Sequence, residues 1–538
     1  MSYIKKMSEF VTPEVAQRAG CVDSLPASDP LVSGLVYDSR KVQADNCYFA
    51  LSGLHVDGHR FVSDAIARGA SLIVHQDELP LDTRQQAACI RVKDSRFAMS
   101  PIADAFYGSP SRCLALIGVS GTEGKSTTVY LIYQLLRLLG KKAGFISTVQ
   151  YSDGGDVQWN SEHQTTPEAP IIHEHLARMC DGGAEYAVVE ASSHGLSERT
   201  MRLGDAAFDV GVITNVTHEH LEFHGTWEQY RFDKANLFRA LDRVDHHKGS
   251  AGHVPSFGVA NADDKSAAYF AAATKQPVYS YSTAGAEADL VLQTIESRDQ
   301  GNRYTALIRK TGETVAIEDQ LPGAFNAGNT LAALLVVSGI LAIPIKDIVP
   351  FVRDCKPVRG RMTTIRKGQD FELIVDYAHT PSSFKTIFPP LRKRIAAHGG
   401  RIISLFGSAG DRDTQKRSEQ GRIAAEWSDL VILTDEDPRS EVPMAILEDI
   451  SRGIPAGRRG ENLFLIPERP AAIRKAFSLA QAGDLVLLLG KGHENSIIYA
   501  DRTMPYDEIA EAERALGELL NAKTSSYAVP RSPRGFET

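Results

Sequence analysis

The chain has 538 residues, a length that suggests about three domains. Apolar residues make up 43% of the sequence and charged residues 23%, as in an ordinary globular protein. The formal net charge of −8 excludes the broad basic surface of a nucleic-acid-binding protein, so we expect no nucleic-acid partner.

The sequence also argues against a secreted or membrane protein. No apolar segment follows Lys5 and Lys6, and the apolar run 331–345 is interrupted by Pro344 and too short to span a bilayer. The six cysteines are far apart, without paired metal-ligand spacing, which suits a reduced compartment. We therefore expect a cytoplasmic protein with no membrane partner.

Strand and helix patterns alternate from the start of the chain. Short strands are predicted at 34–37, 47–51 and 71–74, with a helix at 61–68. These short, mixed elements assign residues 1–110 to a small mixed α/β domain.

A second region begins with the apolar strand 114–117. Further strands are predicted at 187–190 and 210–214, and a helix at 326–340. This alternation favours a mostly parallel sheet with helices on both faces, which we assign to a central domain, 111–358.

The third region shows the same alternation of predicted strands and helices. It follows a predicted linker at 355–361 that is rich in breakers and charge. We assign residues 359–522 to a C-terminal domain and 523–538 to a disordered tail, because Ser, Pro and Arg become frequent from Asn521. Buried strands of the C-terminal domain are predicted at 373–375, 401–406, 430–433 and 485–489.

The most informative segment is Gly-Val-Ser-Gly-Thr-Glu-Gly-Lys-Ser-Thr-Thr at 118–128, between a buried strand and a helix at 129–139. Such a turn points backbone N–H groups and the positive end of the helix at a phosphate. Lys125 supplies a cation for the terminal phosphates, and the Ser126 hydroxyl is a ligand for Mg²⁺. Val119 stands where the common pattern has its first glycine. The segment predicts binding of ATP or GTP.

Acidic and imidazole groups follow other strands. Glu190 closes an apolar strand, the segment 214–225 holds three His and two Glu, and Lys234 lies fourteen residues beyond His220. Carboxylates at the carboxyl ends of parallel strands are suitable Mg²⁺ ligands. Taken singly, however, each group is more typical of a solvated surface position.

Together these segments resemble the Mur ligase family from about Asp38 to Leu520. The segments are Asp38-Ser-Arg40, Gly121-Thr-Glu-Gly-Lys-Ser126, Glu190-Ala-Ser-Ser-His194, His220-Leu-Glu-Phe-His-Gly225, Asn261-Ala-Asp-Asp264, Gly323-Ala-Phe-Asn326, Asp376-Tyr-Ala-His-Thr-Pro381, Gly410-Asp-Arg-Asp413, Asp437-Pro-Arg439 and Gly490-Lys-Gly-His-Glu494.

The resemblance implies an α/β protein of three domains: a small mixed N-terminal domain, a central P-loop ATPase-like domain and a Rossmann-like C-terminal domain. It implies a ligase that uses ATP and two Mg²⁺ ions in peptidoglycan precursor synthesis. ATP would phosphorylate the D-glutamate carboxylate of UDP-N-acetylmuramoyl-L-alanyl-D-glutamate, and the amine of a diamino acid would attack the acyl phosphate.

The resemblance also implies the catalytic residues. Lys125 would clamp the β,γ-phosphates, while Ser126 and Glu190 would hold one Mg²⁺. His220 and a carbamylated Lys234 would hold the second, because carbamylation turns a cation into an anionic oxygen donor.

Three groups of binding residues follow from the same resemblance. ATP would be bound by Gly121, Thr122, Glu123, Gly124, Lys125, Ser126, Thr127, Asn261, Asn326, Arg361 and Asp376, with Asn329 a further candidate. The UDP-muramoyl substrate would be bound by Tyr37, Ser39, Leu54, His55, Val56, Gln164, Thr165, Thr166, Ser192 and Arg202, with Arg199 competing for the last position. The amino acid would be bound by Arg412, Glu436, Asp437, Pro438, Arg439, Gly490 and Glu494.

Three positions depart from the family pattern. Glu123 stands where Asn is common and places an anion near the triphosphate, and Gln164 replaces another Asn. Asp437 replaces the Asn that accompanies Arg in members specific for meso-diaminopimelate. An ionised Asp repels a second carboxylate and attracts an ammonium group, so lysine or ornithine is favoured slightly over diaminopimelate. In that case Arg439 is expected to pair with Asp437.

Two alternatives remain open at this point. One is a ligase similar to folylpolyglutamate synthetase, and the other is an inactive nucleotide-binding scaffold, for which Glu123 is the best argument. We also expect a monomer whose three domains close around the substrates.

Overall fold

The chain divides into two compact units, and the main boundary falls between Lys356 and Pro357, within the segment 355–361. Across the described residues, no helix is both long and apolar enough to cross a membrane. The structure is a computed structural model that describes residues 3–53, 56–160, 164–217, 221–248, 252–298, 301–455 and 459–527.

The first unit begins with an α/β domain built on a four-stranded parallel sheet. Helix α5 (Ser95–Phe106) packs on this sheet and is capped by Asp94, which accepts hydrogen bonds from the N–H groups of Arg96 and Phe97. The first three strands match the predicted ones. The strands lie in chain order as β3 (Gly34–Val36), β4 (Asn46–Phe49), β5 (Leu72–His75) and β6 (Ala88–Arg91).

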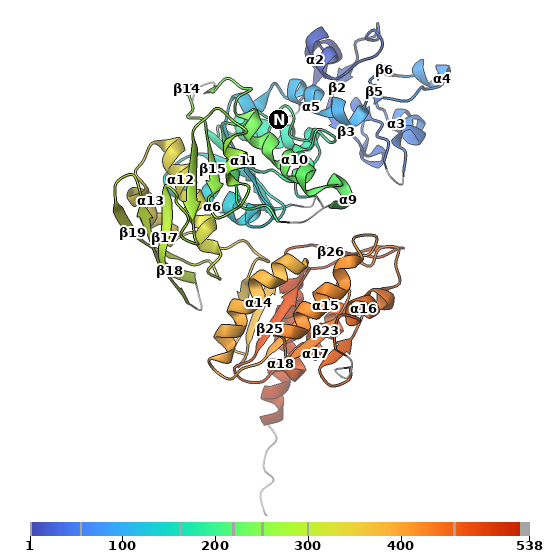
Figure 1. Cartoon of the computed structure of the whole chain (residues 1–538). Coiled ribbons are helices and arrows are strands. Elements are labelled where there is room, and N and C mark those ends of the chain that lie inside the picture. The colour runs from blue at the N-terminus through green and yellow to red at the C-terminus, as the bar shows by residue number, and fades with distance from the viewer. Residues whose placement is uncertain are drawn as a thin grey trace, which may run out of the picture. The chain divides into compact units, whose positions relative to one another are not determined.

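A larger sheet forms the rest of the first unit (Figure 1). Its central strands pair in parallel. All of them except the strand at 278–282, where Tyr279 is exposed, are buried on both faces, as their mostly apolar sequences lead us to expect. In spatial order the central strands are β8 (Ala143–Ile146), β11 (Tyr186–Glu190), β7 (Ala115–Ser120), β12 (Val210–Ile213), β15 (Phe257–Asn261) and β16 (Val278–Ser282).

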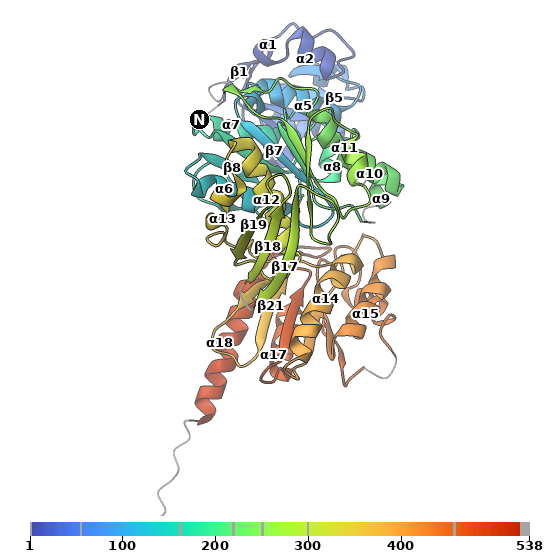
Figure 2. The ribbon, with the colours of Figure 1, turned by 60° about the vertical axis from the view of Figure 1, so that its left-hand side comes forward.

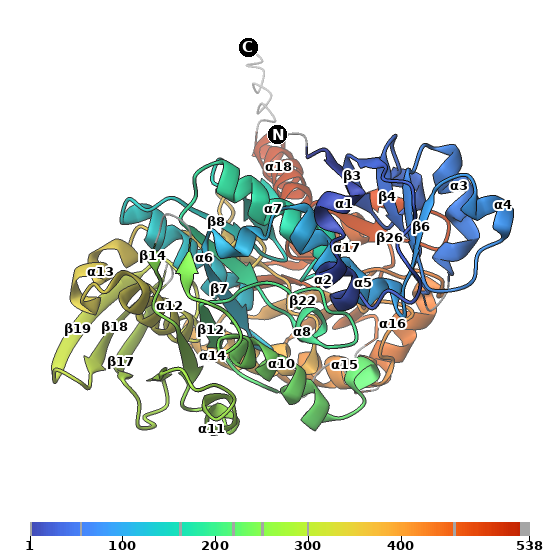
Figure 3. The same ribbon diagram turned by 90° about the horizontal axis from the view of Figure 1, so that it is seen from above.

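Helices cover both faces of this sheet. Helices α6 (Lys125–Leu138) and α12 (Asn326–Leu341) pack against each other on one face. Helices α7 (Ala169–Asp181) and α10 (Trp227–Ala240) belong to the apolar core of the other face. Figure 3 shows α12 and α10 on opposite sides of β12. This is the parallel sheet with two helical layers that the sequence predicts.

Three glycines lie in register across neighbouring strands of this sheet. Gly118 of β7 is paired with Gly211 of β12, which is paired with Gly258 of β15. A Cβ at Gly118 would lie 2.5 Å from Leu237, and one at Gly258 would lie 2.5 Å from Phe238. The row of glycines therefore lets α10 approach the sheet closely.

The large sheet also has antiparallel edges that were not predicted. Strands β9 (Gln150–Ser152) and β10 (Gln158–Trp159) form one edge. The other edge is formed by β17 (Leu290–Arg298), β18 (Gly301–Ile308) and β19 (Glu313–Asp319), which Figure 2 shows side by side. Most side chains of β17 are exposed, so its sequence lacks the apolar pattern of a buried strand.

The second unit is a six-stranded sheet between two helical layers. Helices α14 (Pro381–Ala396), α15 (Gln415–Trp427) and α16 (Pro443–Ser451) cover one face, and α17 (Arg469–Leu479) and α18 (Glu508–Tyr527) the other. All strand pairs are parallel except the first. The spatial order is β20 (Thr363–Ile365), β21 (Glu372–Asp376), β25 (Leu485–Leu489), β22 (Ile402–Phe406), β23 (Leu430–Leu433) and β24 (Leu463–Leu465).

The C-terminal helix corrects one expectation about the tail. A disordered tail was predicted from residue 523, with its composition changing at Asn521, but α18 continues to Tyr527. The segment 508–520 is rich in Ala, Leu and Glu, which are strong helix formers, and the helix propagates from it into the polar residues beyond.

A buried arginine joins two strand ends in the second unit. Arg469 is fully buried and makes an ion pair with Glu508 of α18, with an Nη2 to Oε1 distance of 2.6 Å. Its guanidinium also donates to the carbonyls of Asp435 (2.9 Å) and Leu489 (2.7 Å), beyond β23 and at the end of β25. Because β22 lies between these strands, the guanidinium bridges ends that the sheet itself does not pair.

We predict that Arg469→Met lowers the free energy of unfolding of the second unit by about 3–5 kcal/mol. The substitution leaves the Glu508 carboxylate buried without its partner and removes the donors to two carbonyls. Urea unfolding followed by circular dichroism measures the change.

Arg422→Met is the matched control, because Arg422 pairs with Glu419 and Glu426 on the exposed side of α15. Its unfolding curve should overlay that of the wild type. Equal stability of the Arg469→Met variant and the wild type would contradict the bridging role.

Candidate active site

The predicted phosphate loop is a turn at 121–124 between β7 and α6. Gly121 and Gly124 have φ values of +147° and +86°. The Lys125 Nζ donates a hydrogen bond to the carbonyl of Thr122 (2.8 Å), so the ammonium group folds back over the turn. The first N–H groups of α6 have no partners within the helix and are available at the same turn. This arrangement suits a polyphosphate anion.

Both glycines are needed because other side chains approach the turn closely. A Cβ at Gly121 would lie 1.8 Å from Thr214 Oγ1, and one at Gly124 would lie 2.4 Å from Asn329 Oδ1. Thr214 follows β12, and its hydroxyl donates to the carbonyl of Glu123 (2.6 Å). The end of β12 and the first turn of α12 therefore fix the shape of the loop.

Glu190 lies beside the start of α6, as predicted. The parallel register pairs Glu190 with Val119 of β7. Its Oε2 accepts hydrogen bonds from the Ser126 hydroxyl (2.9 Å) and from the N–H of Thr148 (2.8 Å), and the side chain is buried. A hydroxyl and a carboxylate this close form the hard oxygen donor set that Mg²⁺ prefers.

Lys234 reaches the other side of the same loop. It is 2% exposed, and its Nζ donates to the carbonyl of Gly121 (2.6 Å) and lies 4.5 Å from the ring centre of Tyr230. The Tyr230 hydroxyl is 3.0 Å from Thr122 Oγ1. Lys125, Glu190 and Lys234 thus converge on one loop, whereas His220 lies outside the described residues.

Residues predicted to bind the muramoyl peptide lie beside Glu190, because the Thr166 hydroxyl donates to the Glu190 carbonyl (2.8 Å). Thr166 Oγ1 accepts a hydrogen bond from the N–H of Ser192 (2.9 Å). Arg202 donates from Nη1 to the carbonyl of Thr166 (2.9 Å). Arg199 instead donates to the carbonyl of Phe223. Of the two arginines considered for this position, Arg202 is the one that contacts the Thr166 segment.

The remaining residues of this group are more scattered. Gln164 and Thr165 immediately precede Thr166, with Gln164 exposed. The residues predicted for the uridine end belong to the N-terminal domain, where Val56 is 59% exposed. They are Tyr37, Ser39 and Val56, while Leu54 and His55 lie outside the described residues.

Two asparagines connect α12 with the phosphate loop. Asn326 begins the helix and accepts a hydrogen bond from Asn329 Nδ2 (2.8 Å). Asn329 Oδ1 in turn accepts from the Thr128 hydroxyl of α6 (3.2 Å). Asn261 ends β15, where its Oδ1 accepts from the N–H of Asp263, and it makes no described contact with the loop.

The other two residues predicted for the nucleotide belong to the second unit. Both carboxylate oxygens of Asp376 accept backbone hydrogen bonds, from Met362 (2.7 Å) and Ala378 (2.7 Å). Burial raises the pKa of Asp376, and the nearby Arg361 opposes that shift. The Arg361 guanidinium lies 4.7 Å from the ring centre of Tyr377.

The predicted amino-acid pocket contains an ion pair that the sequence analysis missed. Asp437 Oδ1 accepts hydrogen bonds from Lys491 Nζ (2.9 Å) and the N–H of Ile498 (3.0 Å), and Lys491 also pairs with Glu494. The prediction that Arg439 pairs with Asp437 is therefore wrong. Arg439 has a left-handed backbone (φ +55°), and its buried Nε has no hydrogen-bond partner among the described residues.

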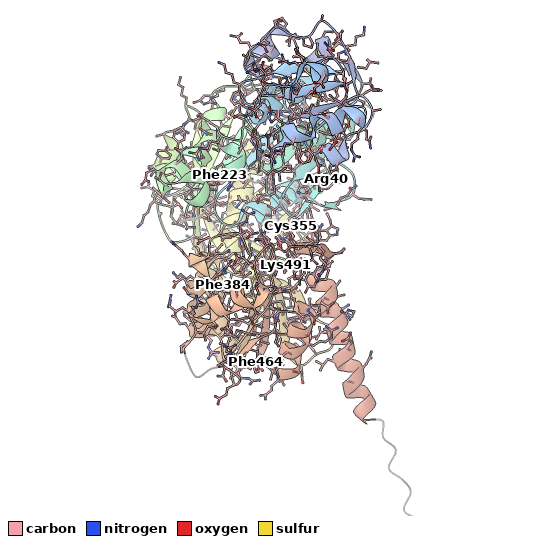
Figure 4. The ribbon with its side chains drawn as sticks, turned by 90° about the vertical axis from the view of Figure 1, so that its right-hand side faces the viewer. Arg40, Phe223, Cys355, Phe384, Phe464 and Lys491 are labelled. Carbon is pink, nitrogen blue, oxygen red and sulfur yellow. The ribbon has the colours of Figure 1, made fainter. Side chains whose placement is uncertain are left out.

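Lys491 is buried past the end of β25 and is labelled in Figure 4. Burial alone would lower the pKa of Lys491, but the carboxylates of Glu494 and Asp437 raise it above its usual value. Lys491 therefore places a positive charge between two carboxylates of the acidic pocket.

The other members of the pocket group surround this pair. Glu436 is buried, which raises its pKa, and a Cβ at Gly490 would lie 2.8 Å from its Oε2. A Cβ at Gly410 would lie 1.9 Å from the carbonyl oxygen of Pro438, so the loop that carries the exposed Arg412 packs directly on the pocket segment. All of these residues except Arg412 have described contacts with the pocket.

Four residues with structural roles at these sites were absent from the predicted groups. Thr214 and Asn215 follow β12 and bind the backbone of Glu123, while Lys491 and Tyr377 lie inside segments already noted. Their position directly after buried strands or inside glycine-rich motifs was the available signal.

Three family profiles match successive parts of the chain. They are described as "Mur ligase family, catalytic domain" at 31–107, "Mur ligase middle domain" at 119–337 and "Mur ligase, glutamate ligase domain" at 360–492. The UDP-N-acetylmuramyl-tripeptide synthetase of Treponema denticola is 49% identical over 534 residues, which cover 96% of this chain and 98% of that protein. The chain belongs to the Mur ligase family.

Two further relatives agree with this assignment. The UDP-N-acetylmuramoyl-L-alanyl-D-glutamate–2,6-diaminopimelate ligase of Geobacillus kaustophilus is 38% identical, over 91% of this Mur ligase and 96% of that protein. A solved structure of a ligase with the same name is 27% identical, with a TM-score of 0.59, and covers 97% of this chain and 100% of that one. This Mur ligase is an ATP-dependent, peptide-forming ligase of cell-wall synthesis with the three-domain fold of its family.

We predict that Gly121→Ala lowers kcat/KM for ATP in this Mur ligase by about 100-fold, because the added methyl displaces Thr214 or the loop by the order of an ångström. Steady-state kinetics with varied ATP measure the effect.

Gly140→Ala is the matched control. Gly140 also has a positive φ (+77°), yet a Cβ there meets nothing within 4 Å. It should lose some stability but keep its KM for ATP. Equal ATP kinetics in the two variants would show that the approach of Thr214 does not shape the loop.

Proposed function

We propose that this Mur ligase adds a diamino acid to the D-glutamate carboxyl of UDP-N-acetylmuramoyl-L-alanyl-D-glutamate, with ATP as the energy source. The observation that carries the proposal is the 49% identity to a tripeptide synthetase over nearly the whole of both chains. The convergence of Lys125, Glu190 and Lys234 on one loop supports the same chemistry.

The protein's own groups then act by positioning and by electrostatic stabilisation. Lys125 clamps the β,γ-phosphates over the turn, and the first N–H groups of α6 donate hydrogen bonds to the anion. Ser126 and Glu190 hold one Mg²⁺, which when bound neutralises phosphate charge as it develops. Asn261, Asn326, Arg361 and Asp376 are each proposed as ATP-binding residues on the adenosine side.

A second Mg²⁺ is proposed at Lys234 and His220. An ammonium group cannot ligate a metal, whereas a carbamate on Lys234 supplies anionic oxygens beside Gly121. The burial of Lys234 beside the phosphate loop supports this role, because a lysine side chain is rarely buried unless it interacts with specific partners.

The amino acid is proposed to be lysine or ornithine rather than meso-diaminopimelate. Lys491 and the Ile498 N–H hold Asp437 Oδ1, so Oδ2, which has no described hydrogen bond, is available to an ammonium group of the substrate. Glu436 Oε2 is a second acceptor without a described partner. Arg439, whose buried Nε has no hydrogen-bond partner among the described residues, can bind the α-carboxylate, which every candidate amino acid carries.

Several further expectations stand as parts of this proposal. The domain limits are 1–110, 111–358 and 359–522, and the protein acts as a cytoplasmic monomer. The muramoyl peptide is bound near Thr166, Ser192 and Arg202. The folylpolyglutamate alternative has less support, because the relatives at 49% and 38% identity are named as a UDP-N-acetylmuramyl-tripeptide synthetase and a diaminopimelate ligase.

We predict phosphate release that requires ATP, the UDP-N-acetylmuramoyl dipeptide and a diamino acid together. Lys234→Ala should lower kcat by about 100-fold or more, and added bicarbonate should not restore it, because alanine cannot carry a carbamate.

Lys310→Ala is the matched control, since Lys310 is exposed in the turn after β18. It should turn over like the wild type, and bicarbonate should not affect it. Unchanged turnover of Lys234→Ala would remove the carbamate from the mechanism.

We predict that the wild type prefers lysine or ornithine over meso-diaminopimelate by at least about tenfold in kcat/KM, or about 1.4 kcal/mol. Asp437→Asn should shift this ratio toward diaminopimelate by about tenfold, because an amide donor replaces the free carboxylate oxygen. Ligation assays with the three amino acids measure both ratios.

Asp501→Asn is the control, because Asp501 is exposed and pairs with Arg502. A wild-type preference of tenfold or more for diaminopimelate would refute the proposed selectivity.

A further inference from the structure

The second unit contains one side chain that touches both its nucleotide-side and its amino-acid-side residues. The Tyr377 hydroxyl donates a hydrogen bond to Glu494 Oε1 (3.2 Å). The Arg361 guanidinium lies over the ring of the same tyrosine, 4.7 Å from its centre. We propose that Tyr377 is a positioning residue that holds the Glu494 carboxylate in the amino-acid pocket and the Arg361 guanidinium at the nucleotide. This proposal rests on the roles of Glu494 and Arg361 in the proposed function.

The Glu494 carboxylate is held at both oxygens by two different donors. Lys491 pairs with Oε2, and Tyr377 donates to Oε1. Because the Glu494 side chain is 26% exposed, it has room to change rotamer when one donor is lost. Two donors on opposite oxygens fix the plane of the carboxylate, and therefore the direction in which it meets a substrate amine.

The pocket loop is also packed directly on Tyr377. A Cβ at Gly492 would lie 2.7 Å from Tyr377 Cβ, so the loop after β25 approaches the tyrosine as closely as a glycine allows. The ring contacts His493 on this loop, with ring centres 4.5 Å apart. It also contacts His379, at 4.6 Å. The tyrosine itself is therefore rigidly placed.

The segment that carries Arg361 meets the same loop. A Cβ at Gly360 would lie 2.4 Å from the N of His493 and 2.5 Å from the C of Gly492. Arg361 thus extends from backbone packed on the pocket loop, and its buried Nε has no described hydrogen-bond partner. The aromatic face of Tyr377 supplies the interaction that orients this guanidinium.

The ring and the hydroxyl of Tyr377 have separable effects. Tyr377→Phe removes only the hydrogen bond to Glu494 and keeps the face beneath Arg361. We expect it to raise KM for the amino acid by about tenfold and to leave KM for ATP within about twofold. Tyr377→Leu removes both interactions, and KM for ATP should then rise as well.

Tyr3→Phe is the matched control, because it removes a tyrosine hydrogen bond to a carboxylate, Asp181, in the first unit. Neither KM should change in that variant. Urea unfolding of all three variants identifies any loss of folded protein.

A double-mutant cycle with Glu494→Gln tests whether the hydroxyl acts through Glu494. If it does, Tyr377→Phe raises KM for the amino acid in the wild type but adds little in Glu494→Gln. Additive effects, or an unchanged KM for the amino acid in Tyr377→Phe, would overturn the positioning role. The proposed function would still stand in that case, provided that the wild type turns over. Absence of wild-type turnover with every diamino acid would overturn both.

Discussion

The close approach of α10 to the central sheet is the constraint on which the phosphate site depends. Gly118, Gly211 and Gly258 form a row across three parallel strands, and Leu237 and Phe238 occupy the space that their side chains would fill. The same helix carries Lys234 one turn earlier, and its Nζ therefore reaches the carbonyl of Gly121. Larger residues in the row would lift α10 and withdraw Lys234 from the loop. The glycines thus determine the position of Lys234 indirectly, through the distance between α10 and the sheet.

In the second unit, a buried ion pair rather than close packing at glycines fixes the positions of the loops. Its pocket segments follow β23 and β25, which are separated by β22. Arg469 ties the backbone at Asp435 and Leu489 together, and Glu508 compensates its charge. A buried ion pair gains little net stability, because desolvating both charges offsets their attraction. Its value here is geometric, since it fixes the distance between the two loops that carry the predicted amino-acid pocket.

The sequence allowed prediction of features that depend on local pattern. The strands at 430–433 and 485–489 have the predicted limits because they are continuous apolar runs. A turn between strand and helix was predicted within 118–128 from its residue types, but the strand extends to Ser120 and the helix begins at Lys125, so the turn itself is shorter, at 121–124. Features that depend on distant partners were missed. Lys491 is 54 residues from Asp437, so the wrong partner was expected for that carboxylate. Lys234, taken alone, is typical of a surface lysine, and only the row of glycines on other strands explains its burial.

The pairing of Asp437 with Lys491 changes what an Asn-to-Asp exchange means at this position. An asparagine could keep the Oδ1 contacts with Lys491 and the Ile498 N–H and would turn its Nδ2 donor toward the pocket. Asp437 keeps those contacts and presents Oδ2 instead. The exchange therefore replaces a single donor atom with an acceptor, on a segment whose backbone Arg469 holds at Asp435. The cation beside Asp437 is already committed to Asp437 and Glu494, so in the proposed pocket the exchanged atom changes from one that favours a second carboxylate of the substrate to one that favours an ammonium group.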